Sequence, residues 1–372
     1  MEIKTKKEKI AEIENKFKSI REILTSRNNP LYFFDNDVDG LASFLLLRKY
    51  TGKGKAVAIK SFPELSLAYT RKVNELMPDC VFVLDKPQIA KGFLEWMKQK
   101  GYWLIWIDHH QDSTSFFEYN HEENFIFVNP TLEIGINKPA TYWVYELIKC
   151  PKDLDWIAAL GCIGDWWVPE FIGEVYKKYK DLFEIPESEI RDAGKLIYET
   201  SFGKLVLLLN FGLKDTTTNV IRMTKFLSGV RSPYEILEPS EKNKSIHKRF
   251  MQINKAYQKL LDKAKGFSRH DVLFFQYGGN LSISAELSNA LTYLYPNKII
   301  VVAHLKGDRA KISIRSKYNI RNLVLTAVKD FENATAGGHE NALGANVSIE
   351  DLPLFKDKLI KLWRIEKKKL AK

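Results

Sequence analysis

The pattern of apolar and polar positions predicts two α/β regions joined by helices. Over the first 150 residues, short apolar runs alternate with amphipathic stretches, as in a parallel sheet with helices on both faces. The expected strands lie near residues 31–34, 56–60, 81–84, 103–107 and 125–128. The expected helices lie near residues 4–26, 40–50, 66–77, 88–99 and 140–149. In the first helix, an apolar stripe predicts core packing and contains Ile10, Ile13, Phe17, Ile20 and Leu24.

The second half of the chain reads as a helical stretch followed by a smaller α/β region. Residues 151–264 are predominantly helical in pattern, and residues 241–265 predict a long, charged connecting helix. Beyond it we expect strands near 271–277, 298–304, 309–316 and 345–349, with helices near 284–295 and 319–332. The predicted organisation is a first domain at 1–200, a helical linker at 201–265 and a second domain at 266–372, with a cleft between the two domains.

Acidic and imidazole side chains follow several of the expected strands. The run Asp-Asn-Asp-Val-Asp-Gly occupies residues 35–40, and Asp-His-His occupies residues 108–110, each directly after an apolar run. Asp85 follows the strand near 81–84, and Asp165 lies in an otherwise apolar helical stretch, residues 156–167. Because the carboxyl ends of parallel strands meet at one edge of a sheet, these groups are expected to converge.

A bound cation is the simplest explanation of the first acidic run. Asp35, Asp37 and Asp39 alternate, so an extended backbone would place all three carboxylates on one side, where they repel unless neutralised. Taken alone, this run also fits a calcium loop or a solvated turn. Taken alone, Asp85 also fits a helix N-cap. The combination favours a metal site.

The ordered set of motifs resembles the DHH phosphoesterase superfamily. The motifs are DNDVDG at 35–40, Leu-Asp at 84–85, Ile-Asp-His-His at 107–110 and Gly-Cys-Ile-Gly-Asp at 161–165. Near the C-terminus, Gly-Gly-His-Glu-Asn-Ala-Leu-Gly at 337–344 resembles the signature of the DHH-associated C-terminal domain. Within the superfamily the chain is most similar to RecJ-like nucleases, specifically the compact archaeal type. The resemblance implies a parallel-sheet DHH catalytic domain and a smaller substrate-binding domain.

The resemblance also implies a centre that binds two metal ions. Two divalent cations about 3.5–4 Å apart can activate a water and stabilise charge on a phosphoryl group. Oxygen-rich ligation with histidine suits Mn²⁺, with Mg²⁺ or Co²⁺ as substitutes. His110 is expected to contact the phosphate and Asp108 to orient an imidazole. The expected ligands are Asp35, Asp37, Asp39, Asp85, His109 and Asp165, with Asp85 as the bridge between the ions.

One expected ligand departs from the family pattern. Several branches of the superfamily carry a histidine two or four residues before the position of Asp37, where this chain has Asp35 and Phe33. Asp35 therefore either completes the first metal site or lies behind it, with water as the last ligand.

Residues 309–317 alternate basic or hydroxyl side chains with apolar ones, which predicts a strand with one packed and one cationic face. An ordinary solvated face usually mixes both signs of charge, so we interpret this face as phosphate-binding rather than as surface decoration. Glycines also let a backbone approach phosphate closely, which favours a binding role for the Gly-Gly-His segment over a plain turn. With the resemblance, the predicted substrate-binding residues are Lys311, Ser313, Arg315, Gly337, Gly338 and His339.

Composition adds a preference for polyanionic partners. The formal net charge is +11, although the expected site concentrates acidic residues. This excess of positive charge favours nucleic acid as a partner. The alternative explanation is the lysine-rich surface of a thermophilic protein. There is no apolar stretch of about 18 residues, so we expect no membrane span and a cytoplasmic protein. The three cysteines lie far apart, so disulfides and structural zinc are not expected.

Three functional hypotheses follow. The favoured one is a Mn²⁺-dependent exonuclease that degrades single-stranded DNA, or RNA, in repair or replication, with a replication or repair helicase as a partner allowed by the resemblance. The second is a phosphodiesterase or phosphatase for short oligonucleotides or small nucleotides, of the nanoRNase or phosphoadenosine-phosphate phosphatase type. The third is a non-catalytic replication scaffold, although such relatives lose ligands that are present here.

Overall fold

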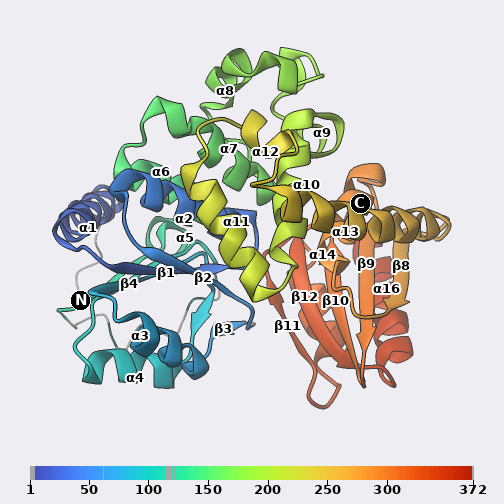
Figure 1. Ribbon diagram of the computed structural model, residues 1–372. Coiled ribbons are helices and arrows are strands. Elements are labelled where there is room, and N and C mark those ends of the chain that lie inside the picture. The colour runs from blue at the N-terminus through green and yellow to red at the C-terminus, as the bar shows by residue number, and fades with distance from the viewer. Residues whose placement is uncertain (1–4, 62, 112, 114–118, 120–122, 371–372) are drawn as a thin grey trace. The chain divides into compact units, whose positions relative to one another are not determined.

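The chain forms two compact units, residues 1–250 and 251–372, in a computed structural model (Figure 1). The structure describes residues 5–370 except 62, 112, 114–118 and 120–122. The helix α13 (Lys244–Lys265) carries the boundary between the units, within the stretch expected as a linker. Each unit has its own sheet and its own hydrophobic core.

The first unit is built on a parallel five-stranded sheet with the order β2-β1-β4-β6-β7. Every neighbouring pair in this sheet is parallel, as the alternation of strands and helices predicts. A separate two-stranded sheet pairs β3 (Glu64–Leu65) with β5 (Gln88–Ile89). The strands of the main sheet are β1 (Pro30–Asp35), β2 (Lys55–Ile59), β4 (Cys80–Leu84), β6 (Leu104–Ile107) and β7 (Phe125–Val128).

Helices cover both faces of this sheet, as expected (Figure 1). Alternate residues of β1 divide between two cores, with Tyr32 and Phe34 on one side and Leu31 and Phe33 on the other. One core is closed by helices that include α1 (Lys6–Ser26), α2 (Val38–Thr51), α6 (Ala140–Ile148) and α7 (Asp155–Gly164). The other is closed by α3 (Thr70–Leu76) and α4 (Lys91–Gln99). The predicted stripe of α1 is buried except at Ile10, which is 43% exposed.

The rest of the first unit is helical, as the pattern from residue 151 predicts. Its longer helices, α10 and α11, pack on the α2 side of the sheet. The remaining helices are α5 (Pro130–Ile134), α8 (Ile172–Lys178), α9 (Ala193–Glu199), α10 (Ser201–Leu213), α11 (Thr217–Gly229) and α12 (Tyr234–Leu237), with 3₁₀ turns at Leu67–Tyr69, Lys152–Leu154, Lys180–Leu182 and Glu187–Glu189.

The second unit contains a mixed sheet with the order β11-β12-β10-β9-β8. Only the β8–β9 pair is parallel. The helix α14 (Ser284–Leu294) packs against β9 and β10, while α15 (Arg321–Val328) and α16 (Leu352–Leu370) contribute to a core with the apolar residues of β10. The strands are β8 (Val272–Gly278), β9 (Ile299–Lys306), β10 (Arg309–Arg315), β11 (Thr335–Gly338) and β12 (Ala342–Ser348). The strand β11 was not predicted.

Among the described residues, no single helix is both long enough and apolar enough to cross a membrane. One bent pair, α9 with α10, meets at 81° and passes the test on length and composition alone.

Candidate metal centre

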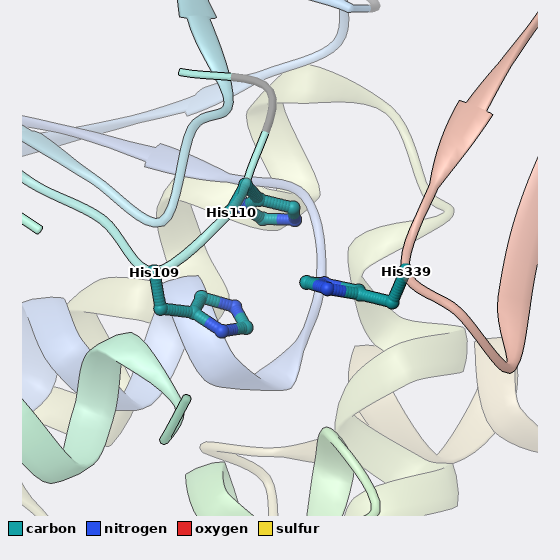
Figure 2. Close-up of side chains that lie close together, drawn as sticks. All are labelled: His109, His110 and His339. Atoms are coloured by element: carbon teal, nitrogen blue, oxygen red, sulfur yellow. The ribbon is translucent and has the colours of Figure 1, made fainter. Parts of the chain in front are cut away.

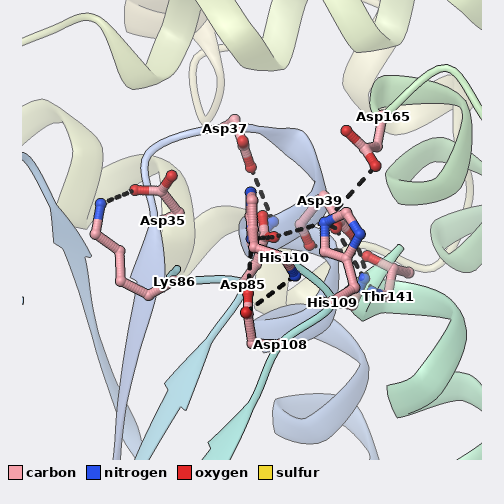
Figure 3. A network of polar contacts seen from close by, with 12 residues as sticks. Asp35, Asp37, Asp39, Asp85, Lys86, Asp108, His109, His110, Thr141 and Asp165 are labelled. Atoms are coloured by element: carbon pink, nitrogen blue, oxygen red, sulfur yellow. Dashed lines mark hydrogen bonds and ion pairs between the residues drawn. The ribbon is translucent and has the colours of Figure 1, made fainter. Parts of the chain in front are cut away.

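The acidic and imidazole residues of the first unit gather where its parallel strands end. Asp35 is the last residue of β1, and Asp85 comes directly after β4. The strand β6 is followed by Asp108 and then by His109 and His110, whose rings lie 4.5 Å apart and are tilted by 50° (Figure 2). Figure 3 shows these side chains together with those of α2 and the end of α7. The geometry of a parallel sheet thus brings together residues that lie far apart along the chain.

The backbone of the first acidic run differs from the expected one. Only Asp35 belongs to the strand, because α2 begins at Val38 with Asp37 as its N-cap, and the Asp37 carboxylate accepts the Gly40 N–H at 3.0 Å. The extended backbone predicted through Asp39 is therefore wrong. A Cβ at Gly40 would lie 2.6 Å from the Asp35 carbonyl oxygen, so glycine is what lets α2 start this close to β1.

Asp39 is fixed by a second helix. It is 2% exposed, and its two carboxylate oxygens accept the N–H groups of Ala140 at 2.9 Å and Thr141 at 2.8 Å, in the first turn of α6. Free N–H groups at a helix start stabilise an anion in this position. The Asp39 carboxylate is thus held rigidly at the site.

His109 presents one ring nitrogen to three carboxylates. Its Nε2 lies 3.3 Å from Asp85 Oδ1 and 3.7 Å from an oxygen of each of Asp39 and Asp165. On the other side of the ring, Nδ1 lies 3.4 Å from Asn137 Oδ1. A proton on Nδ1 would leave the lone pair of Nε2 directed at the carboxylates, which is the arrangement of a metal-binding histidine. Asn137 was not predicted as a site residue.

Asp85 combines a strained backbone with a buried carboxylate oxygen that lacks a hydrogen bond within the described residues. Its φ of 57° lies in the left-handed region, which costs free energy for a residue with a Cβ. The side chain is 2% exposed, and Oδ1 makes no hydrogen bond to any described residue, although His109 Nε2 lies 3.3 Å away and His110 Nδ1 3.9 Å away. Burial, followed by the charges of Asp39 and Asp37, raises the pKa of Asp85 well above its ordinary range.

The donor set fits divalent cations. Two groups in the first unit have their ligand atoms within 4.8 Å of one another, and they are Asp39–His109–Asp165 and Asp85–Asp108–His110. Burial and the neighbouring Asp35 and Asp39 raise the pKa of Asp37 to about 7. Carboxylates that resist ionisation in this way are stabilised when a cation neutralises them. The buried Oδ1 of Asp85 and these oxygen and imidazole donors therefore suit Mn²⁺ or a similar ion.

Asp108 and His110 form a tight pair beside this cluster. Asp108 is fully buried, and its carboxylate accepts from His110 Nδ1 at 2.7 Å, from the His110 N–H at 3.0 Å and from Asn129 Nδ2 at 3.2 Å, as well as from the Ser113 hydroxyl. Burial alone would lower the pKa of His110, but the charge and hydrogen bond of Asp108 outweigh it and raise this pKa to about 9. The imidazole is therefore cationic at neutral pH and fixed in orientation.

Lys86 is the main site residue that the sequence did not reveal. Its side chain is fully buried, and Nζ donates to Asp35 Oδ1 at 2.8 Å and to the Ser61 carbonyl at 2.9 Å. This ion pair occupies one oxygen of Asp35, whose side chain is 22% exposed. The position of this lysine directly after Asp85 could have predicted the ion pair, because a buried ammonium next to an acidic cluster requires a carboxylate partner.

The other predicted site residues lie in the second unit. On β10, Ala310, Ile312 and Ile314 are buried, as the alternating pattern predicts. On the opposite face Lys311 is exposed, Ser313 donates to Ser284 at 2.9 Å, and Arg315 Nε donates to Asn289 Oδ1 at 2.8 Å.

Two glycines of the second unit leave one row of paired positions in this sheet largely without side chains. Ser313 pairs with Gly344, which pairs with Gly337, so two of three adjacent strands carry no side chain in this row. Gly338 has a φ of 125°, and a Cβ there would lie 2.5 Å from the Ala342 carbonyl oxygen. His339, labelled in Figure 2, begins the turn from β11 to β12 and donates its N–H to that same carbonyl at 2.9 Å.

The raised pKa of Asp37 predicts that the metal-free chain loses stability as pH rises. The folded chain holds this proton up to about pH 7, whereas the unfolded chain releases it near 3.8, so ionisation costs stability across that window. Asp37→Asn keeps a helix cap and removes the titration. In EDTA, the variant should match wild type in Tm at about pH 4 and exceed it at about pH 8. Thermal melts across this range check the prediction, and a difference that does not change with pH would contradict it.

Removing Lys86 should destabilise the metal-free chain. Lys86→Met leaves Asp35 without its buried partner among other carboxylates, at a cost of roughly 3 kcal/mol. Urea unfolding in EDTA measures this cost. Lys72→Met is the matched control, because its pair with Glu75 is exposed and its loss should cost less than about 1 kcal/mol. Equal costs for the two variants would show that the Lys86 pair has no special role.

Comparisons with known proteins agree with this architecture. The DHHA1 domain family matches residues 270–364. A solved structure described as the DHH domain of a member of a ribosomal-protein family is 16% identical, with a TM-score of 0.66, and the match covers 96% of this chain and 92% of that one.

Two RecJ structures are also similar. RecJ from Thermus thermophilus in complex with Mn²⁺ is 16% identical with a TM-score of 0.55, covering 95% of this chain but only 55% of that one. An exonuclease RecJ bound to manganese is 16% identical with a TM-score of 0.51, covering 96% and 94%. A comparison with curated proteins gives no match. Residues 270–364 thus match the DHHA1 domain family, and the chain shares the fold of the solved DHH-domain and RecJ structures.

Proposed function

We propose that the chain is a metal-dependent phosphodiesterase and, more specifically, an exonuclease that degrades single-stranded nucleic acid from one end. The observation that carries the proposal is the donor group Asp39–His109–Asp165 at the carboxyl edge of the parallel sheet, with the buried Oδ1 of Asp85 3.3 Å from His109 Nε2. The RecJ structures that share the fold are described as manganese-bound, which supports Mn²⁺ as the ion, with Mg²⁺ or Co²⁺ as substitutes.

In this proposal the carboxylates and one histidine hold two ions. Asp39, His109 and Asp165 would bind one ion, Asp37 would contribute a further oxygen, and Asp85 would contact both. When bound, such ions activate a water and stabilise the charge of a phosphoryl group in transfer. Asp35 would lie behind them, because Lys86 already binds one of its oxygens.

His110 would donate a proton or a hydrogen bond to the substrate. Its cationic form is stabilised by Asp108, which accepts from Nδ1 and so leaves the opposite nitrogen, Nε2, as the one that can serve a phosphoryl oxygen or a leaving group. Asp108 acts as a positioning residue, because its hydrogen bonds set the orientation and charge of this ring.

The second unit would bind the substrate backbone. The β10 face opposite the core carries the exposed Lys311 and the half-buried Arg315, which is held in place by Asn289 of α14. The row of Ser313, Gly344 and Gly337 lets a phosphate approach the sheet closely. Together with the net charge of +11, this favours a polyanion over a small uncharged ester.

The proposal is tested by end-labelled oligonucleotides in Mn²⁺ with Asp85→Asn. Asparagine tolerates the left-handed backbone of this position, so the fold should survive, while a neutral amide cannot serve two cations. We expect hydrolysis of long single strands to fall by more than about a hundredfold. Asp153→Asn, which changes an exposed acid of the same unit, is the matched control and should retain full activity.

The same assay separates the competing activities. Progressive shortening from one end of a long single strand supports the exonuclease. Rapid hydrolysis of dinucleotides with negligible action on long strands would replace it with a short-oligonucleotide phosphodiesterase. No hydrolysis of any length by the wild-type protein, with Mn²⁺, Mg²⁺ or Co²⁺, would contradict the enzymatic assignment.

A further inference from the structure

The strand β2 forms one edge of the parallel sheet. It pairs with β1 on one side, and no other strand pairs with it within the described residues. Its residues 56–58 are half-buried and apolar rather than shielded by bulky polar groups. An open edge of this kind presents N–H and C=O groups that can pair with another extended chain.

A groove runs along this edge. It has a volume of about 360 Å³ and is lined by the consecutive residues 55–58 of β2. Successive side chains of a strand point to opposite faces, so a groove that touches all four follows the edge itself. Its opposite wall is α11, which passes beside β2 (Figure 1).

The wall formed by α11 has a regular helical stripe. The residues that line the groove recur every three or four positions and are Thr217, Val220, Ile221, Thr224, Lys225 and Ser228. Ile221 is 54% exposed, whereas the adjacent Val220, which also lines the groove, is buried. The groove therefore has an apolar lining that remains accessible.

The rim of the groove is strongly basic. Five basic side chains line it against one acidic side chain, Glu75, which pairs with Lys72 at 2.7 Å. Arg48, Lys55 and Lys225 form no ion pair within the described part of the chain. A single lysine on an edge strand guards it against pairing, but a basic rim around an apolar lining favours an acidic occupant instead.

The chemistry favours a peptide over a nucleic acid. Single-stranded nucleic acids bind on exposed aromatic rings, whereas the one aromatic residue of this groove, Phe44, is 2% exposed. Aliphatic side chains beside an open strand edge suit a segment with alternating side chains.

We propose that the groove between β2 and α11 binds an extended segment of a partner protein in which acidic and apolar side chains alternate. The segment pairs with the open edge of β2, its apolar side chains contact Val57 and Ile221, and its carboxylates meet Arg48, Lys55 and Lys225. This site uses none of the residues assigned to the metal centre.

The test is fluorescence anisotropy of labelled short peptides with the full chain. The probe alternates Glu and Val, and the controls are a peptide alternating Lys and Val and a single-stranded oligothymidylate. Lys225→Glu should weaken binding of the Glu–Val peptide by about tenfold or more. Lys180→Glu, an equal charge reversal at another exposed position of the same unit, should leave it unchanged.

Backbone pairing is tested with two versions of the probe, each N-methylated at one alternate set of amides. Because only one set faces the edge strand, one version should lose binding and the other should keep it. The proposal is overturned if the Glu–Val peptide does not bind, if both methylated versions bind equally, or if both charge reversals act alike. If Lys225→Glu weakens the oligothymidylate but not the peptide, the groove belongs to nucleic acid instead.

Discussion

Repulsion among buried carboxylates is the constraint on which the first unit depends. Groups of the protein itself offset part of this repulsion by donating hydrogen bonds to the carboxylates. Lys86 donates to Asp35, two helix N–H groups donate to Asp39, and the imidazole of His110 donates to Asp108. Within the described part of the chain, Asp85 Oδ1 receives no such hydrogen bond, and the backbone of Asp85 is strained. The negative charge that remains uncompensated is thus concentrated at Asp85, where a bound cation would neutralise it. Binding of that cation would therefore both stabilise this region and supply its proposed chemistry.

Much of this arrangement could be predicted because it follows from strand ends. An apolar run followed by an acid indicates the carboxyl edge of a parallel strand, and the sheet order then brings Asp35, Asp85 and Asp108 together. The contacts that tune the site depend on tertiary approach instead. Nothing local in the sequence shows that Asp39 meets the start of α6 or that Asn137 reaches the ring of His109.

The errors have physical causes as well. The alternation of Asp35, Asp37 and Asp39 suggested an extended chain, but an aspartate three residues before glycine can also cap a helix, and α2 begins there. The strand β11 was missed because its two glycines lower strand propensity, while pairing with β12 compensates. The strand β10 and its packed face were predicted correctly, because the alternating apolar residues lie in a core.

Anomalous diffraction from a crystal soaked in manganese tests the central claim most directly, because it locates the ions without reference to activity. The account predicts two anomalous peaks about 4 Å apart, with Asp85 as a ligand of both and His109 as a ligand of one. The absence of peaks next to Asp85 in a crystal that binds manganese elsewhere, or a single ion held without Asp85, would contradict it.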